Sequence, residues 1–401
     1  MNPSHPPLLA TLRALPGSVW VLYAGTFLNR FGTFVVPFLA LYLTNRGFSA
    51  GQAGIALSAY GFGHLGAALL GGQLADTFGR RKTILLSMFA SAVTMLLFSM
   101  ATTYPAILLL ALLAGLATET YRPAAAALLT DMVDDAHRVT AFAGYRIAIN
   151  AGWAIGPAVG GLLAKHSYTW LFVGDAVTSI LFGLIAWVAL PAGLRLSAAQ
   201  KVSFRLSVQT IAWDVRFMRV LVASFLVGVI FMQTSTTFGL QIKAGGYSEF
   251  VFGAMLSLNG IMIILFELPL TIWTRRFPPV IMIAAGYFLC GLGFALNILG
   301  NTISIYILSV VVFTIGEMIS LPVWMSHVAQ LAPTPLRGRY MGANGLTWAV
   351  ALIVGPSAGM ALFAVHPNTL WVASGLCGAL SAVILLKKET APPVVAESAT
   401  A

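Results

Sequence analysis

The sequence predicts an all-α integral membrane protein with twelve transmembrane helices in two six-helix halves, related by pseudo-two-fold symmetry. Three observations lead to this fold class. First, 59% of the 401 residues are hydrophobic and only 8% are charged, whereas about a quarter of a typical soluble domain is charged. Second, apolar runs long enough to cross a hydrocarbon core of about 30 Å recur along the whole chain. Third, the chain contains an internal repeat.

The apolar runs define the expected spans. The first run lacks a small-residue cleavage site near its end and is followed by eleven others, so we expect it to remain as a span rather than to act as a signal peptide. The twelve spans are expected at residues 18–43, 51–71, 83–102, 106–130, 140–164, 168–190, 219–242, 250–272, 280–299, 303–331, 339–364 and 368–386.

Basic residues are distributed unevenly between the two sets of loops. Of the 22 Lys and Arg residues, the loops opposite the termini hold only Arg46, Lys165 and Lys243. Loops rich in Lys and Arg stay in the cytoplasm. We therefore expect a multi-pass protein of the inner (plasma) membrane with both termini in the cytoplasm, and we assign the net charge of +10 to topology rather than to nucleic-acid binding.

The repeat relates the two halves at a constant offset of 199 residues. The identical pairs are Pro123 and Pro322, Arg138 and Arg337, Gly156 and Gly355, Pro157 and Pro356, and Gly160 and Gly359. We expect an N-terminal half at residues 1–190, a cytoplasmic linker with a surface helix at 191–218, a C-terminal half at 219–390 and a tail at 391–401. Parallel repeats of this kind form a substrate site between the halves, and transport follows from rocking of one half on the other.

Residues 72–82, GQLADTFGRRK, lie between the second and third spans. Arg80 follows Asp76 by four residues, close enough to pair with it, and Gly79 allows a tight turn. The segment therefore indicates a contact that holds the cytoplasmic side closed. Its key positions are Gly72, Asp76, Gly79, Arg80 and Arg81.

Residues 152–161, GWAIGPAVGG, place poor helix formers inside the fifth span. Small residues four apart let two helix backbones approach closely, and a proline kink is tolerated among neighbouring helices. We expect a tight, bendable helix contact formed by Gly152, Gly156, Pro157, Gly160 and Gly161.

These two segments resemble motifs A and C of the major facilitator superfamily, and the chain as a whole is similar to the twelve-helix drug:proton antiporter branch. Thr77 stands where motif A usually has a base, and Ala143 stands where motif C usually has its first glycine. The resemblance implies a monomer in which helices one, four, seven and ten line the cavity. It also implies that Asp76 caps the eleventh helix when the site faces outward, and that motif C marks an antiporter, more often an exporter.

Ionisable groups at mid-depth in the bilayer cost about 2.5–3.5 kcal/mol each, so each needs a partner or a cavity. Glu317 is central in the tenth span and has no base within four residues, so we expect it to be the main proton and cationic-substrate site. Arg30, Glu119 and Arg122 are expected to modulate it, with Glu119 and Arg122 three residues apart and able to pair. The alternatives are a structural ion pair for Glu317 across the halves and a purely structural Glu119–Arg122 pair.

Further polar and aromatic residues are candidates for the cavity wall. They are Phe27, Asn29, Phe34, Arg146, Asn150, Gln233 and Trp324. We expect structural roles for His64, Asp175 and Glu267.

The function expected from these features is proton-coupled efflux of small amphipathic or drug-like compounds by alternating access. Partners are protons, a small-molecule substrate and the lipid bilayer. The sequence has no GxxxxGK[ST] or HExxH motif and no Cys/His cluster, so we expect no cofactor, metal or catalytic residue. One alternative is an ion-coupled carrier of a specific metabolite or lipid, and a more distant one is an intramembrane enzyme. A channel is disfavoured because a pore needs no two-half repeat.

Overall fold

The chain folds into two bundles of helices. The computed structural model describes residues 15–193, 213–274, 276–331 and 337–387. The N-terminal bundle contains α2 (Gly17–Phe31), α3 (Val35–Asn45), α4 (Ala50–Thr77), α5 (Arg80–Met100), α6 (Tyr104–Glu119), α7 (Tyr121–Met132), α8 (Asp135–His166) and α9 (Thr169–Ala189). The C-terminal bundle contains α11 (Val215–Gln233), α12 (Thr237–Ala244), α13 (Glu249–Thr274), α14 (Pro279–Ala295), the 3₁₀ turn η1 (Leu296–Leu299), α15 (Ile303–Leu331), α16 (Arg337–Val365) and α17 (Pro367–Leu386).

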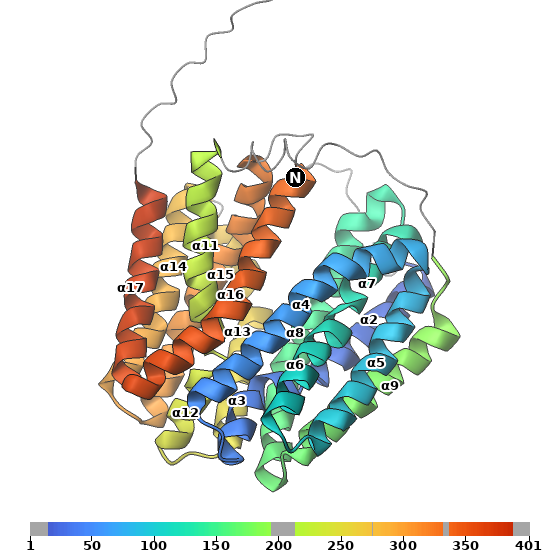
Figure 1. The fold of residues 1–401 in the computed structure, drawn as a ribbon. Helices are drawn as coiled ribbons and strands as arrows, with labels where there is room; N and C mark the ends of the chain where they lie inside the picture. Colours follow the sequence, from blue (N-terminus) through green and yellow to red (C-terminus); the bar gives the residue numbers. More distant parts are fainter. Residues whose placement is uncertain (1–14, 194–212, 275, 332–336, 388–401) are drawn as a thin grey trace, which may run out of the picture.

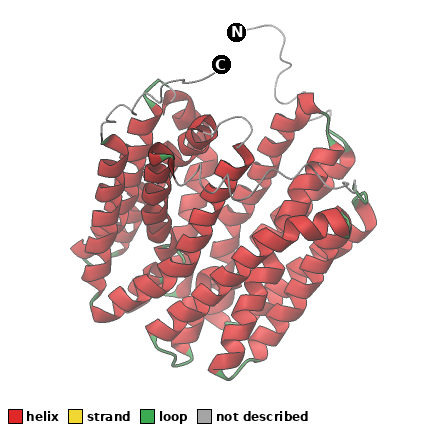
Figure 2. Cartoon of the chain, turned by 45° about the horizontal axis from the view of Figure 1, so that its top comes forward, coloured by secondary structure: helices red, strands yellow, loops and turns green. Residues whose placement is uncertain are grey.

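The described part of the chain contains helices joined by loops and turns (Figure 2). Twelve helical spans in this part are long and apolar enough to cross a membrane. The predicted all-α fold with twelve spans is therefore confirmed. The surface helix expected in the linker and the tail at 391–401 fall on residues 194–212 and 388–401, which lie outside the described residues.

Three of the expected spans are interrupted, which the hydropathy pattern does not predict. The first span breaks at residues 32–34, the fourth at Thr120 and the seventh at residues 234–236. At the first break, Gly32 packs closely on α9, because a Cβ there would overlap the side chain of Thr178. At the third break, Gln233 Oε1 accepts hydrogen bonds from the hydroxyls of Thr236 and Thr237 at 3.2 and 3.0 Å. A count of apolar residues reports neither this close contact nor these hydrogen bonds.

Polar side chains cap several helix starts. Ser49 and Gln52 form a reciprocal capping box at the start of α4. Asp134 accepts a hydrogen bond from the His137 backbone N–H at the start of α8. Asp214 caps α11 in the same way and also accepts a 2.9 Å hydrogen bond from the Tyr340 hydroxyl of α16.

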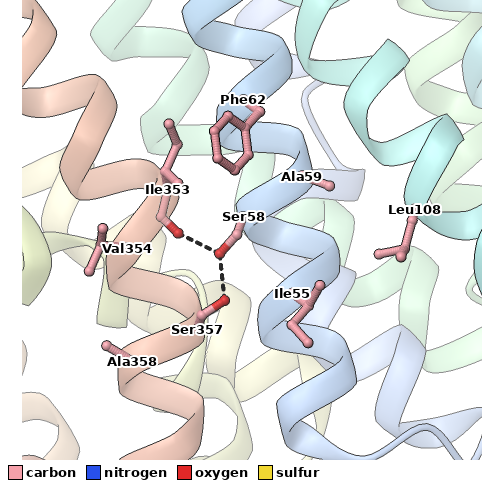
Figure 3. A pocket seen from close by; sticks show the side chains of 9 residues that line it. All are labelled: Ile55, Ser58, Ala59, Phe62, Leu108, Ile353, Val354, Ser357 and Ala358. Carbon is pink, nitrogen blue, oxygen red and sulfur yellow. Dashed lines mark hydrogen bonds between the residues drawn. The ribbon is translucent and has the colours of Figure 1, made fainter.

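One contact between the halves runs along α4 and α16, and we call it the α4–α16 seam. A Cβ at Gly54 would lie 3.0 Å from Pro356 O, and a Cβ at Gly61 would lie 2.8 Å from Leu352 O. Between these glycines, Ser58 donates to Ile353 O and its Oγ lies 2.7 Å from Ser357 Oγ (Figure 3). Glycine is required here because the two backbones touch.

A second contact, the α8–α13 seam, has the same design. Gly253 packs on Pro157 O, and a Cβ at Gly260 would lie 2.6 Å from Ala154 Cα. Between them, Ser257 Oγ accepts a 3.0 Å hydrogen bond from the Ala158 backbone N–H. Gly54, Ser58 and Gly61 repeat as Gly253, Ser257 and Gly260, again at the offset of 199 residues. The repeat thus includes the surfaces on which the halves meet.

The halves separate along α4 and α16 toward the end of the molecule where α4 ends at Thr77 and α16 begins at Arg337. A Cβ built at Gly72 of α4, or at Gly342 and Gly345 of α16, meets nothing within 4 Å. Figure 1 shows these two helices diverging in that direction. The α8–α13 seam extends further, because Arg146 of α8 and Glu267 of α13 form an ion pair of 2.8 Å. The two halves are therefore in contact at the end of the molecule away from the termini. At the other end, α4 and α16 are separated, whereas α8 and α13 still touch.

Candidate functional site

A buried charged cluster joins the first and fourth spans. Arg30 of α2 makes two parallel hydrogen bonds to Glu119, Nη1 to Oε1 at 3.1 Å and Nη2 to Oε2 at 3.2 Å. Arg122 Nη1 donates to the same Oε2 at 3.2 Å. The predicted Glu119–Arg122 pair is present, although the helix is interrupted at Thr120. The structure also pairs Arg30 with Glu119, and this pair is not predicted from the sequence because the two residues are 89 positions apart.

Burial distinguishes the two arginines of the cluster. The side chains of Arg30 and Glu119 are 5% and 7% exposed, whereas that of Arg122 is 48% exposed. The Arg30 guanidinium also lies 5.6 Å from the centre of the Tyr121 ring, a cation–π distance. The bidentate geometry and the aromatic face fix Arg30 in place. Glu119 is accordingly held as a paired carboxylate.

His64 lies beside this cluster on the inner side of α4. Its Nδ1 is 3.9 Å from Glu119 Oε2. Ile55 and Phe62, which are exposed, line an apolar groove of about 560 Å³ along the outer side of the α4–α16 seam (Figure 3). His64 follows Ile55 by nine residues, which is a half turn round the helix at about 100° per residue. The charged cluster is therefore on the face of α4 opposite to that groove.

Glu317 lies in a separate cavity of about 290 Å³ between the halves. Its Oε2 accepts a 2.8 Å hydrogen bond from Asn259 Nδ2, which also donates to Thr314 Oγ1 at 2.9 Å. Among the described residues, no Lys, Arg or His forms an ion pair with Glu317. The alternative of an ion pair across the halves is thus not realised in this conformation.

The cavity wall combines aromatic, apolar and polar side chains from both halves. α8 contributes Asn150 and Trp153, and the C-terminal half contributes Phe231, Phe313 and Asn259 among others. Asn150 is predicted from the sequence, whereas Trp153 and Asn259 are not. Asn259 could have been found from its depth, because it is a polar residue near the middle of the expected span 250–272.

Four other cavity candidates lie elsewhere. Asn29 is 2% exposed, and its Nδ2 contacts Met88 Sδ at 3.6 Å. Phe27 stacks on Phe31, and Phe34 meets Phe31 edge to face within the core. Gln233 is 1% exposed, and its Nε2 donates to Val229 O at 2.8 Å and to Gly355 O at 3.1 Å. Gln233 therefore connects the broken seventh span to α16.

Trp324 is 3% exposed and meets Trp348 at a ring-centre distance of 6.0 Å. Trp348 in turn contacts Phe231 of the cavity wall at 5.3 Å. Trp324 thus supports the wall from behind and is not among the residues that line the cavity.

Two other acids of the spans have ion-pair partners. Glu267 pairs with Arg146, a bridge between halves, and Glu249 pairs with Lys243 at 2.6 Å. Asp175 is 2% exposed, and its Oδ2 has no hydrogen-bond partner among the described residues. The ion pair agrees with a structural role for Glu267, and the structural role expected of Asp175 stays a prediction.

In the motif A segment, Gly79 has φ +98°, so the predicted tight turn is present. Arg80 pairs with Asp131 of α7, Nε to Oδ2 at 3.0 Å, and Arg81 Nη1 donates to Leu190 O at 3.1 Å. The side chain of Asp76 lies outside the described residues, so its expected pairing with Arg80 stays a prediction. Gly72 faces open space.

The motif C glycines make the tight helix contacts that the sequence predicts. A Cβ at Gly152 would lie 2.6 Å from Arg30 Cβ, and one at Gly156 would lie 2.5 Å from Phe31 O. Gly160 faces Phe38, while Gly161 faces Glu249 O across the halves. Motif C thus packs α8 on the first span at the position of Arg30 and on the opposite half.

Comparison with known proteins identifies the architecture. The sequence model of the Major Facilitator Superfamily matches residues 22–356 and 221–401. This chain belongs to the Major Facilitator Superfamily. It is a multi-pass membrane transporter, not an enzyme. The predicted family is therefore confirmed.

Curated relatives in this superfamily cover most of the chain. The MFS-type transporter YqjV of Bacillus subtilis (strain 168) is 29% identical over 348 residues, with 85% of each chain covered. A Na(+), Li(+), K(+)/H(+) antiporter of Planococcus maritimus is 26% identical over 382 residues and covers 87% of this chain and 88% of its own. The quinolone resistance protein NorA of Staphylococcus aureus (strain MSSA476) is 24% identical over 398 residues, with 92% and 96% covered.

Solved structures share the fold at low sequence identity. A point mutant of the nucleoside transporter NupG superposes with a TM-score of 0.81 at 17% identity, with 92% of this chain and 99% of that chain covered. The peptide transporter POT in complex with sulfate superposes with a TM-score of 0.77 at 17% identity, with 95% and 97% covered. Both likenesses concern the fold alone.

Proposed function

We propose that this transporter is a proton-coupled antiporter that exports small amphipathic cations, with proton and substrate competing for Glu317. The observation that carries the proposal is an acid without an ion-pair partner, among the described residues, on the wall of a cavity between the halves. Glu317 is half-buried, and a carboxylate bound only by an amide can be neutral or charged, whereas Glu119 is held charged by two guanidinium groups. Glu317 is therefore the acid suited to exchange its proton for a cation.

The cavity wall suits an organic cation. Trp153, Phe231 and Phe313 offer aromatic faces, and these attract cations as well as apolar groups. The drug-resistance and cation/proton antiporter names of two relatives support export and proton exchange.

The uneven loop charges support cytoplasmic termini in a plasma membrane. The parted end of the molecule would then face the cytoplasm, so this conformation is inward-facing, and residues 1–190 and 219–390 would move as the two rocking units of a monomer. A proton that crosses 100 mV releases about 2.3 kcal/mol, which can drive substrate export.

The test uses purified protein in liposomes that contain a pH-sensitive dye. An inside-acid gradient is imposed, tetraphenylphosphonium is added as the cation, and the proton flux is recorded. We expect substrate-dependent proton flux in the wild type, its loss in Glu317→Gln, and its retention in Glu249→Gln, an acid at the start of α13 that lies outside the cavity wall. Equal flux in the wild type and Glu317→Gln would remove Glu317 from the coupling path. Absence of cation-dependent flux from the wild type would favour the metabolite or lipid carrier.

A further inference from the structure

The charged cluster of the N-terminal half carries a surplus positive charge. Two guanidinium groups, Arg30 and Arg122, share the single carboxylate of Glu119. Arg30 already uses both oxygens of Glu119 in its bidentate pair. Arg122 therefore adds a positive charge that Glu119 does not balance. Keeping such a charge at membrane depth is costly unless it faces water or a ligand.

Arg122 has unused hydrogen-bonding capacity. An arginine side chain presents five N–H donors in a planar fork. In the described structure, one hydrogen bond is recorded for this fork, from Nη1 to Glu119 Oε2. The side chain is 48% exposed, so an edge of the fork is accessible. That edge matches the two oxygens of a carboxylate, as bidentate arginine pairs do.

The contact between Arg122 and Glu119 lies away from the outer groove of the α4–α16 seam. His64 and Arg122 both approach Oε2 of Glu119. His64 is on the face of α4 opposite Ile55, which lines the outer groove. The end of the Arg122 side chain that contacts Glu119 is therefore on the face of α4 that carries His64, opposite to that groove.

We propose that Arg122 binds an anionic group of the transported compound, so that the preferred members of the substrate class are ammonium compounds that also carry a carboxylate, with the carboxylate at Arg122 and the amine at Glu317. The amine half of this assignment rests on the proposed function, whereas the anion site at Arg122 does not. Glu119 stays bound to Arg30 when the ligand arrives, and Arg122 gains a second carboxylate partner. The two charged ends are held by opposite halves, so the ligand connects the units that move.

Three probes with one ring system test the assignment by calorimetry on the purified full-length protein. They are 6-(aminomethyl)-2-naphthoic acid, its methyl ester and 2-naphthoate, which present a zwitterion, a cation and an anion. We expect the zwitterion to bind about tenfold more tightly than the ester in the wild type. Arg122→Gln should abolish this ratio and the binding of 2-naphthoate while retaining affinity for the ester.

Two further variants separate a specific site from a folding defect. Arg122→Lys keeps the charge and should restore part of the preference for a carboxylate, while Arg219→Gln, which changes an exposed arginine bonded to Lys387 O, should leave the ratio unchanged. A failure of Glu317 to bind amines would appear as equal ester affinity in the wild type and Glu317→Gln, with 2-naphthoate binding still dependent on Arg122. Equal carboxylate-to-ester ratios in the wild type and Arg122→Gln, or no preference in the wild type, would overturn the anion site.

Discussion

At the scale of single residues, the two central acids of the spans differ in their partners. Glu119 is 7% exposed and accepts hydrogen bonds from both Arg30 and Arg122. Glu317 accepts one from the amide of Asn259. Breaking a buried ion pair leaves an uncompensated charge, whereas changing a carboxylate bound to an amide removes no countercharge. Glu119 is therefore fixed in one charge state and Glu317 is not.

This difference predicts opposite costs for one chemical change. Glu119→Gln leaves two guanidinium groups with no carboxylate and should lower the free energy of unfolding by about 3–5 kcal/mol. Glu317→Gln keeps an acceptor for Asn259 and should cost about 1 kcal/mol or less. Thermal unfolding of the two purified variants in the same detergent measures the contrast. A lower unfolding temperature for Glu317→Gln than for Glu119→Gln would contradict this account of the charges.

At the scale of helices, the two seams explain how a chain rich in glycine holds its halves together. In both seams a serine lies between two glycines, and the facing helix carries the GPxxG pattern of motif C or its repeat. Two helix backbones can touch only where the residues at the contact are small, as glycine is. The seams are thus the contacts that must open if the molecule is to expose its other end.

A bulky residue in a seam should favour that other conformation. Leucine at Gly253 would enter the space of Pro157 O, so the ends of α4 and α16 near the termini should approach each other as the seam opens. Spin labels on Gly72→Cys and Gly342→Cys, in a chain with Cys290 and Cys377 replaced by alanine, report this distance. We expect a shorter distance in Gly253→Leu.

Gly17→Leu is the matched control for that measurement, because a Cβ at Gly17 meets nothing within 4 Å. It should leave the label distance unchanged. A Gly253→Leu distribution identical to that of the control would show that the seam does not set the conformational balance.

At the scale of the whole molecule, the sequence predicts the architecture well and the site only in part. The twelve apolar runs predict the spans, and the 199-residue offset predicts the two halves. Both features can be read directly from the order of residues in the chain. The Arg30–Glu119 pair depends on how two distant helices pack, which order alone does not determine. Glu317 was identifiable from its depth, whereas Asn29 and Gln233 turn toward neighbouring helices although they lie at the same depth. The seam residues could have been found by extending the offset to Gly54 and Gly253.

In the proposed transport mechanism, one carboxylate serves both proton and substrate in the alternating-access cycle. If a cation and a proton compete for one group, the affinity for the cation must increase as the pH rises and the proton is released. The increase is up to about tenfold for each pH unit. The slope arises only where Glu317 is protonated in the free protein and must release its proton before the cation binds. Replacing this carboxylate with an amide removes the linked proton.

The most direct measurement is the dissociation constant of tetraphenylphosphonium for the purified protein from about pH 5 to about pH 9. We expect the wild type to bind more tightly as the pH rises, Glu119→Gln to retain this slope, and Glu317→Gln to bind weakly with no slope. Parallel curves for the wild type and Glu317→Gln would contradict the proposed mechanism.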